Sequence, residues 1–199
     1  DATRVEVNTI SAEMAKVRDY VPDYAVMAHR GSTFWAPEET ESAWRWAREM
    51  GADYLESDLQ CTKDGVILAN HDDNLKRTTN IENVYSELVP ATRKAFYMRH
   101  GMSEEEAEKL VAADKASFRP YYAMSYMYEE LLALDAGSWF NETSIEQARK
   151  SFAEKHQYVS ALEDQIRYAE GKMLKRGSDG ERIYTVTGTW DPDKPRDCL

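Results

Sequence analysis

Two histidines and two carboxylates in the first 80 residues are the side chains best suited to chemistry. His29 and His71 each follow a short apolar run, and Glu56 and Asp58 alternate within another. Because side chains two apart on a strand point the same way, Glu56 and Asp58 are expected to face one side together. Two hard carboxylate oxygens on one face suit Mg²⁺ or Ca²⁺. The set predicts a metal-dependent hydrolytic site.

A phosphodiester is a substrate that such a set could cleave. Cleavage requires that the negative oxygens be neutralised, that a proton leave the attacking hydroxyl, and that a proton reach the leaving alkoxide. A divalent ion with two imidazoles can supply all three, since the unperturbed histidine pKa of about 6.5 suits transfer in either direction. Arg30 is expected to contact the phosphate, and Asp72 to orient His71.

The pattern around these residues indicates strands that alternate with helices. The expected elements are strands at residues 24–28, 53–59 and 66–70, with a tight turn at residues 64–65, and a helix at residues 41–50. Such alternation predicts a parallel sheet with helices packed outside it. In an α/β barrel, the ends of neighbouring parallel strands would bring His29, the Glu56/Asp58 pair and His71 to one rim.

Residues 85–126 lack strand signals and are expected to form a helical insertion within the domain of residues 1–199. Ser103 and Glu106 form a capping-box pattern there. Two more helices are expected to begin at Thr143 and Ser160, the second with Leu162, Ile166, Ala169 and Met173 on its apolar face. A fourth strand is expected at residues 183–187.

Composition excludes several classes of protein. The formal net charge of −11 among 199 residues argues against a nucleic-acid partner, which would require a basic face. No apolar run approaches the ~20 residues that span a bilayer. The two cysteines form no disulfide framework. Because the sequence starts at Asp1, either a processed exported protein, periplasmic or extracellular, or a trimmed chain is expected, and a cytoplasmic location stays open.

The chain resembles the glycerophosphodiester phosphodiesterase family over residues 24–80 and 129–141. The matching motifs, in order, are His29-Arg30-Gly31, Pro37-Glu38-Glu39-Thr40, Gly51-Ala52-Asp53, Glu56-Ser57-Asp58, Thr62-Lys63-Asp64-Gly65, His71-Asp72, Arg77-Thr78-Thr79-Asn80 and Leu134-Asp135-Ala136-Gly137-Ser138-Trp139-Phe140-Asn141. The resemblance implies a TIM-type (β/α)8 barrel with an insertion after its third strand. It also implies hydrolysis of small glycerophosphodiesters, such as glycerophosphocholine or glycerophosphoethanolamine, to sn-glycerol 3-phosphate and an alcohol.

The resemblance further assigns roles to the candidate residues. His29 and His71 would be the acid/base pair, in an order that the sequence leaves open. Glu56 and Asp58 would bind Ca²⁺ or Mg²⁺, and Arg30 would contact phosphate.

Three departures from the family pattern stand out. Glu39 replaces the usual Asn and is expected to add an acidic group near the mouth of the site. The family's third acidic ligand, a Glu followed two residues later by Lys on the fourth strand, has no counterpart in residues 183–190. A (β/α)8 barrel needs about 250 residues, so this chain is expected to be the N-terminal part of a longer protein, although a half-barrel that pairs with something stays open.

Two alternative functions stay open. One is a phospholipase D-like enzyme acting on intact sphingolipid or lysolipid, which would use the same set of two histidines and a Glu/Asp pair. Its apolar mouth could be formed by Trp35, Trp139 and Phe140. A non-catalytic module that binds phosphorylated headgroups would explain the missing third carboxylate, but it has little use for a paired acid and base.

Overall fold

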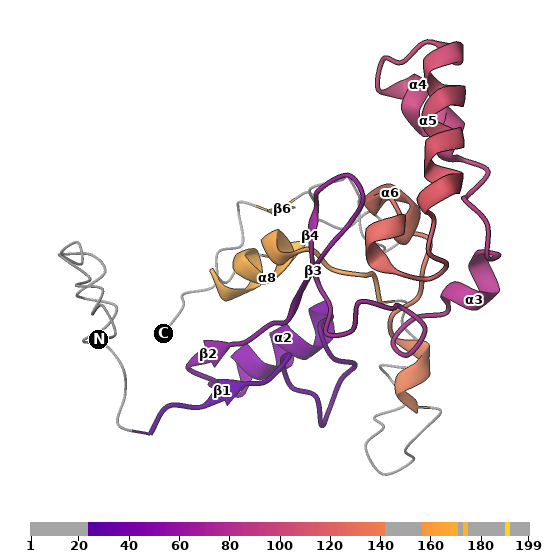
Figure 1. The fold of residues 1–199 in the computed structure, drawn as a ribbon. Helices are drawn as coiled ribbons and strands as arrows, with labels where there is room; N and C mark the ends of the chain where they lie inside the picture. Colours follow the sequence, from indigo (N-terminus) through magenta and orange to yellow (C-terminus); the bar gives the residue numbers. More distant parts are fainter. Residues whose placement is uncertain (1–23, 142–156, 171–172, 175–189, 192–199) are drawn as a thin grey trace, which may run out of the picture.

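The first unit of the fold is a parallel β–α–β arrangement. The computed structural model describes residues 24–141, 157–170, 173–174 and 190–191 (Figure 1). In it, β1 (Met27–Ala28) pairs in parallel with β2 (Tyr54–Leu55), and α2 (Glu41–Glu49) connects them. The Thr40 side chain caps α2 by accepting a hydrogen bond from the backbone N–H of Ala43. This unit confirms the predicted α/β class.

A hairpin follows the β–α–β unit and corrects the predicted strand arrangement. The strand expected at residues 53–59 is interrupted, because β2 ends at Leu55 and β3 (Leu59–Cys61) begins four residues later. β3 pairs antiparallel with β4 (Ile67–Ala69). The reversal occurs at Gly65, which has a φ of +83°, a value that glycine adopts without steric cost. β4 is therefore the return arm of a hairpin, and its partner among the described strands is not β2.

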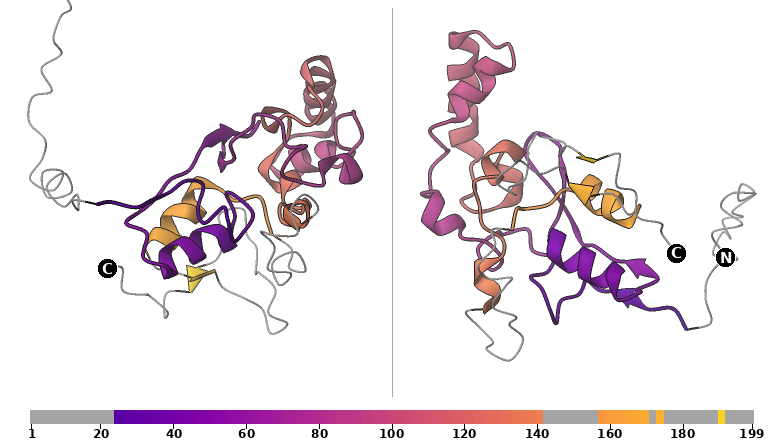
Figure 2. Two further views of the ribbon diagram at one scale, coloured as in Figure 1. Left: turned by 90° about the horizontal axis from the view of Figure 1, so that it is seen from below. Right: turned by 180° about the vertical axis from the view of Figure 1, so that it is seen from behind.

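Helix α8 (Leu162–Ala169) packs beside α2, as Figures 1 and 2 both show. The rings of Trp44 on α2 and Tyr168 on α8 lie 6.1 Å apart, and both are buried with Ala69 of β4. The predicted apolar face of α8 is wrong, since Ile166 is 48% exposed while Asp164, Gln165 and Tyr168 face inward. The helix also starts later than expected: Asp164 accepts the hydrogen bond from the N–H of Ala161.

A second and larger core joins the hairpin to the segments that follow it. These segments are α3 (Ile81–Val84), the 3-10 turn η1 (Ala123–Ser125), α6 (Tyr128–Leu131) and the 3-10 turn η2 (Ser138–Asn141). The core is made by buried apolar side chains of β4, α3, η1, α6 and the loops next to them: Leu68, Leu75, Ile81, Ala123, Tyr126, Tyr128, Leu131, Leu134, Ala136, Val159 and Ala161.

Helices α4 (Arg93–Arg99) and α5 (Glu104–Ser117) form a pair that projects from the rest of the molecule (Figures 1 and 2). The capping box of Ser103 and Glu106 is confirmed at the start of α5. Arg93 is fully buried at the base of the pair, where it donates hydrogen bonds to Glu130 and Asp114. The segment is thus helical as expected, and its status as a domain insertion over residues 85–126 stays a prediction.

The remaining described strands, β5 (Met173–Leu174) and β6 (Trp190–Asp191), pair antiparallel. The helix start expected at Thr143 and the strand expected at residues 183–187 lie outside the described residues. Within the described part of the chain, every helix is too short or too polar to cross a membrane.

Candidate active site

The loop after β1 carries His29, Arg30 and Gly31 and is bent tightly against α2. Arg30 has a φ of +58°, an unusual value for a residue with a side chain, and Gly31 has a φ of +86°. A Cβ atom on Gly31 would lie 2.7 Å from the Cβ of Ala43 and 2.8 Å from its carbonyl carbon. Only glycine fits here, and its close approach to α2 fixes the backbone position of the preceding residues, His29 and Arg30.

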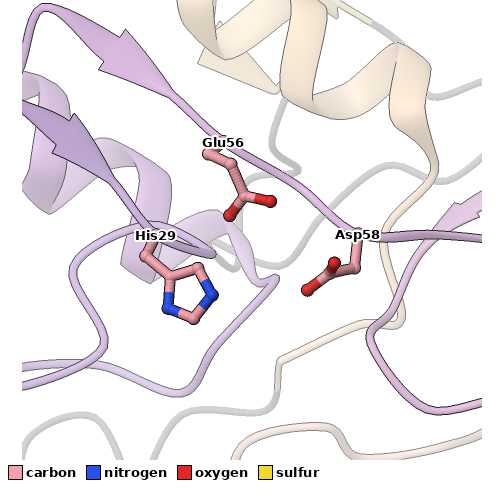
Figure 3. Close-up of side chains that lie close together, drawn as sticks. All are labelled: His29, Glu56 and Asp58. Carbon is pink, nitrogen blue, oxygen red and sulfur yellow. The ribbon is translucent and has the colours of Figure 1, made fainter.

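His29, Glu56 and Asp58 come together in space, as Figure 3 shows. One ligand atom of each residue lies within 4.8 Å of the others. His29 is exposed at the end of β1, while Glu56 and Asp58 are half-buried between β2 and β3. The chain thus brings together the predicted carboxylate pair and one predicted histidine, and the joint arrangement could hold a metal ion.

Arg30 is braced by carboxylates on two sides. Its Nε lies 2.9 Å from Asp58 Oδ2, and its Nη1 lies 3.2 Å from Glu38 Oε1. The backbone N–H of Arg30 also donates a 2.9 Å hydrogen bond to Glu56 Oε2. One oxygen of each candidate ligand is therefore oriented by Arg30, which leaves Glu56 Oε1 and Asp58 Oδ1 for other partners.

Glu39 is buried next to this cluster, so the prediction that it lies near the mouth of the site is wrong. It is only 4% exposed, accepting hydrogen bonds from the Ser57 hydroxyl at 2.6 Å and from the backbone N–H of Asp58 at 2.8 Å. Burial raises the pKa of Glu39 to about 7, an effect that the nearby Asp58 and Glu56 carboxylates reinforce and the two hydrogen bonds oppose. In this position Glu39 supplies the acceptor for the backbone N–H of Asp58, which lies between β2 and β3.

His71 reaches this region through the hairpin rather than through a parallel strand. The backbone N–H of Asn70 donates a 2.9 Å hydrogen bond to the carbonyl of Asp58, so the return arm ends beside the start of the outward arm. His71 is exposed and lies outside the three-residue cluster. Its Nδ1 lies 2.5 Å from Asp72 Oδ1, which agrees with the expectation that Asp72 orients the ring.

Two charged residues to which the sequence analysis gave no role connect these parts. Arg77 pairs with Asp72 and with Glu38, and Glu38 also pairs with Arg30. The hydrogen bond from Arg77 is the largest cause that lowers the pKa of Asp72 to about 2, against the opposing effect of burial. Burial alone would raise the pKa of Glu38, but Arg77 and Arg30 together hold it below its usual value. Both residues belong to the quoted motifs, which is the signal that could have found them.

The donor set of the cluster fits a divalent cation. Two carboxylates supply hard oxygens, which Ca²⁺ and Mg²⁺ prefer, and an imidazole stands beside them. The backbone and side chain of Arg30 hold the carboxylates in place without covering both oxygens of either. The two predicted carboxylate ligands therefore lie next to His29, the residue predicted for acid/base chemistry.

The aromatic residues considered for an apolar mouth separate in the structure. Phe140 is 4% exposed and belongs to the interior. The Trp139 indole N–H donates to the carbonyl of Ala136. Trp35 and Phe34 instead line a cavity of about 330 Å³ whose wall also includes His29. One of the three predicted aromatic residues thus stands next to the candidate site.

Known proteins resemble this chain in sequence. Residues 29–183 match the model of the glycerophosphoryl diester phosphodiesterase family. A glycerophosphodiester phosphodiesterase of Bacillus subtilis is 31% identical over 63% of this chain and 30% of its own length. A glycerophosphoinositol inositolphosphodiesterase of Mus musculus is 28% identical over 80% of this chain and 25% of its own length. The chain therefore spans less than a third of either relative.

A solved structure, that of a glycerophosphodiester phosphodiesterase from Agrobacterium tumefaciens, shares 27% identity with a TM-score of 0.45, and the overlap covers 74% of this chain and 43% of that one. The family match includes the ordered motifs from His29 to Asn80 and supports the prediction of a partial TIM-type barrel. Because the matched model covers more than half of the residues and begins at His29 itself, the chain belongs to the glycerophosphoryl diester phosphodiesterase family.

Proposed function

We propose that this chain carries the site for metal-dependent hydrolysis of glycerophosphodiesters, such as glycerophosphocholine and glycerophosphoethanolamine, to sn-glycerol 3-phosphate and an alcohol. The observation that carries the proposal is the cluster of His29, Glu56 and Asp58, whose ligand atoms lie within 4.8 Å of one another. The two relatives are named as phosphodiesterases of glycerophospho compounds, which supports the same substrate class.

Glu56 and Asp58 would hold the cation, with Ca²⁺ or Mg²⁺ favoured because both free positions are carboxylate oxygens. When bound, the divalent ion neutralises charge on the phosphate oxygens. Arg30 has Nε and Nη1 engaged with Asp58 and Glu38, so Nη2 is the nitrogen proposed to contact phosphate.

His29 and His71 are proposed as the acid and base. Asp72 next to His71 Nδ1 favours a proton on Nδ1 and leaves Nε2 to exchange a proton with the substrate. His29 stands within the carboxylate cluster, where either ring nitrogen can serve a substrate held at the cation. Oxygen-preferring cations leave His29 available for proton transfer, because they do not require an imidazole ligand.

A phospholipase D-like activity on lysolipid is the second candidate, and one observation favours it. The cavity lined by His29, Phe34 and Trp35 is bordered by the exposed apolar side chains of Val26 and Met27. An apolar wall beside the candidate acid/base residue suits a substrate with a hydrocarbon chain. The burial of Phe140 removes part of the apolar mouth that this alternative requires.

Turnover of two substrates by the whole chain separates these candidates. Glycerophosphocholine and lysophosphatidylcholine are each supplied with a divalent cation, and the products are quantified. The proposal predicts release of sn-glycerol 3-phosphate from the first. Turnover of the second substrate alone would replace the proposal with the lipid-cleaving activity. Binding of glycerophosphocholine without turnover would support the headgroup-binding module.

Two variants, each with one histidine replaced, test the mechanism. His71→Ala is expected to abolish turnover but leave binding of glycerophosphocholine intact, since the ring supplies proton transfer and not charge neutralisation. His100→Ala is the control, because that ring stacks on Phe96 in the projecting helical pair. Unchanged turnover in His71→Ala would contradict the assigned role.

A further inference from the structure

The guanidinium of Arg77 bridges two carboxylates from different loops. Its Nε donates a 2.7 Å hydrogen bond to Asp72 Oδ2, and its Nη2 lies 3.2 Å from Asp72 Oδ1. On its other side, Nη2 donates to Glu38 Oε1 at 2.7 Å and Nη1 donates to Glu38 Oε2 at 3.1 Å. Every nitrogen of the guanidinium therefore contacts a carboxylate, and the two pairs fix its plane.

These pairs join the loops of both proposed catalytic histidines. Asp72 contacts His71, which follows β4. Glu38 contacts Arg30, which follows His29 in the loop after β1. The five charged side chains form a continuous line of ion pairs from the proposed metal ligand Asp58 to His71: Asp58, Arg30, Glu38, Arg77 and Asp72. Glu38, at the middle of this line, has a side chain that is only 12% exposed.

We infer that Arg77 is a positioning residue for His71: it holds Asp72 against the ring and, through Glu38, ties the loop of His71 to the loop of His29 and Arg30. The inference rests on the proposed function for the role of His71. It assigns to Arg77 no contact with the substrate, since its nitrogens are already engaged by Asp72 and Glu38.

The chemistry of the imidazole explains what Arg77 would contribute. A neutral histidine carries its proton on one nitrogen, and the partner of that nitrogen decides which one. Asp72 Oδ1 beside His71 Nδ1 favours the Nδ1–H form. Asp72 is half-buried on the surface, so in the absence of Arg77 its carboxylate would be free to rotate toward water. The two contacts from Arg77 hold both carboxylate oxygens of Asp72 and keep Asp72 Oδ1 next to the His71 ring.

Arginine is suited to this role in a way that lysine is not. The planar fork reaches two carboxylates at once with fixed geometry, whereas an ammonium is a point charge on a flexible stem. Arg77→Lys is therefore expected to keep one of the two ion pairs, with Asp72 or with Glu38. It should retain only part of the effect of Arg77 on the tautomer of His71. This partial retention distinguishes a geometric role of Arg77 from a general contribution of its positive charge.

Nitrogen NMR of His71 in the whole chain, at pH 8, reads the tautomer directly and needs no turnover. The wild-type chain is expected to show the Nδ1–H form. Arg77→Ala is expected to mix the two tautomers, and the kcat for glycerophosphocholine is expected to fall by about 10- to 100-fold, as for other residues that orient a catalytic group, with KM little changed. Arg77→Lys should give intermediate values of both.

Lys76→Ala is the matched control. Lys76 is the adjacent cation, is similarly exposed and also forms an ion pair, but its partner Glu82 lies outside the line of ion pairs. Circular dichroism verifies that each variant is folded, which is expected because the Arg77 side chain is 43% exposed. Lys76→Ala should leave the tautomer and kcat as in the wild type.

Several results would overturn the inference. A retained Nδ1–H form, or an unchanged kcat, in folded Arg77→Ala would show that Arg77 does not position His71. A higher KM with an unchanged tautomer would make Arg77 a substrate contact instead. If the wild-type chain releases no sn-glycerol 3-phosphate, the proposed function fails, but the tautomer comparison still decides whether Arg77 positions the ring.

Discussion

The carboxylate of Glu39 accepts a 2.8 Å hydrogen bond from the backbone N–H of Asp58, beneath the cluster that could hold a metal ion. A second hydrogen bond, of 2.6 Å, comes from the Ser57 hydroxyl. These contacts stabilise the non-strand segment that separates β2 from β3 and presents both carboxylates of the cluster. A buried acid therefore supports the proposed metal ligands from behind, at a position where the family usually has Asn.

Glu39 is expected to make the stability of the metal-free protein depend on pH. Its pKa is raised to about 7 by burial, so in the folded state it keeps its proton between pH 4.5 and 7 while the unfolded chain releases it. Its contribution to stability is present below pH 4.5 and is lost as the pH rises through 7. A shift of this size corresponds to at most about 3 kcal/mol. Urea unfolding in EDTA at a series of pH values measures this loss.

The isosteric variant Glu39→Gln tests whether Glu39 causes the pH dependence. The amide keeps an acceptor for the N–H of Asp58 but does not titrate, so the loss of stability between pH 4.5 and 7 should largely disappear. Glu105→Gln is the control, because Glu105 is a highly exposed residue of α5 and its replacement should leave the change of unfolding free energy with pH as in the wild type. If the unfolding free energy of Glu39→Gln changes with pH as steeply as that of the wild type, Glu39 titrates normally.

Gly31 and Gly51 allow backbone strain to be separated from close packing. Both have a φ of +86°, but a Cβ on Gly31 would overlap Ala43 while a Cβ on Gly51 would meet nothing within 4 Å. Gly51→Ala should cost about 1 kcal/mol of stability from the backbone alone. Gly31→Ala should cost about 1 to 3 kcal/mol more, because the loop must move away from α2. Equal unfolding midpoints for the two variants would refute the close approach.

Arg93 is the buried charge on which the projecting helices depend. It is 0% exposed and donates to Glu130, Asp114 and the carbonyl of Ser125. Arg93→Met would leave two buried carboxylates without this partner, at a cost of about 3 to 5 kcal/mol. Arg99→Met is the control, since Arg99 is 52% exposed in its pair with Glu129 and should change stability by about 0.5 kcal/mol or less. Thermal unfolding compares the two variants, and similar midpoints would contradict the buried role of Arg93.

The sequence predicted local structure well where one residue type determines it. The start of α2 at Glu41, the capping box at Ser103 and the turn at Gly65 follow from hydrogen bonds and backbone angles that are local in the chain. The proximity of Glu56 and Asp58 also followed from their spacing, although the segment between β2 and β3 is not a continuous strand.

The predictions that failed depended on tertiary contacts. The predicted apolar face of α8 is one example: Gln165 is buried, where its side-chain amide donates a hydrogen bond to the carbonyl of Leu55, and Ile166 is 48% exposed. Hydrophobic periodicity cannot identify a buried polar residue whose partner is far away in the sequence. The same reason explains why Glu39 was expected near the mouth, and why Arg77, 39 residues from Glu38, received no role.

Cation binding by Glu56 and Asp58 is the central claim, and removal of one charge tests it. Glu56→Gln keeps the acceptor for the N–H of Arg30 but removes a carboxylate ligand, so calorimetry should show much weaker Ca²⁺ or Mg²⁺ binding than in the wild-type chain. Glu82→Gln is the control, since Glu82 pairs with Lys76 outside the cluster and should leave cation binding unchanged. Equal affinities for all three proteins would place the cation elsewhere.

The most direct measurement is the release of sn-glycerol 3-phosphate from glycerophosphocholine by the 199-residue chain, with Ca²⁺, with Mg²⁺ and with EDTA. Release is expected with at least one of the cations and not with EDTA, because the proposed chemistry requires a cation held by Glu56 and Asp58. Release that continues unchanged in EDTA, or that is absent from the folded chain with either cation, would contradict it.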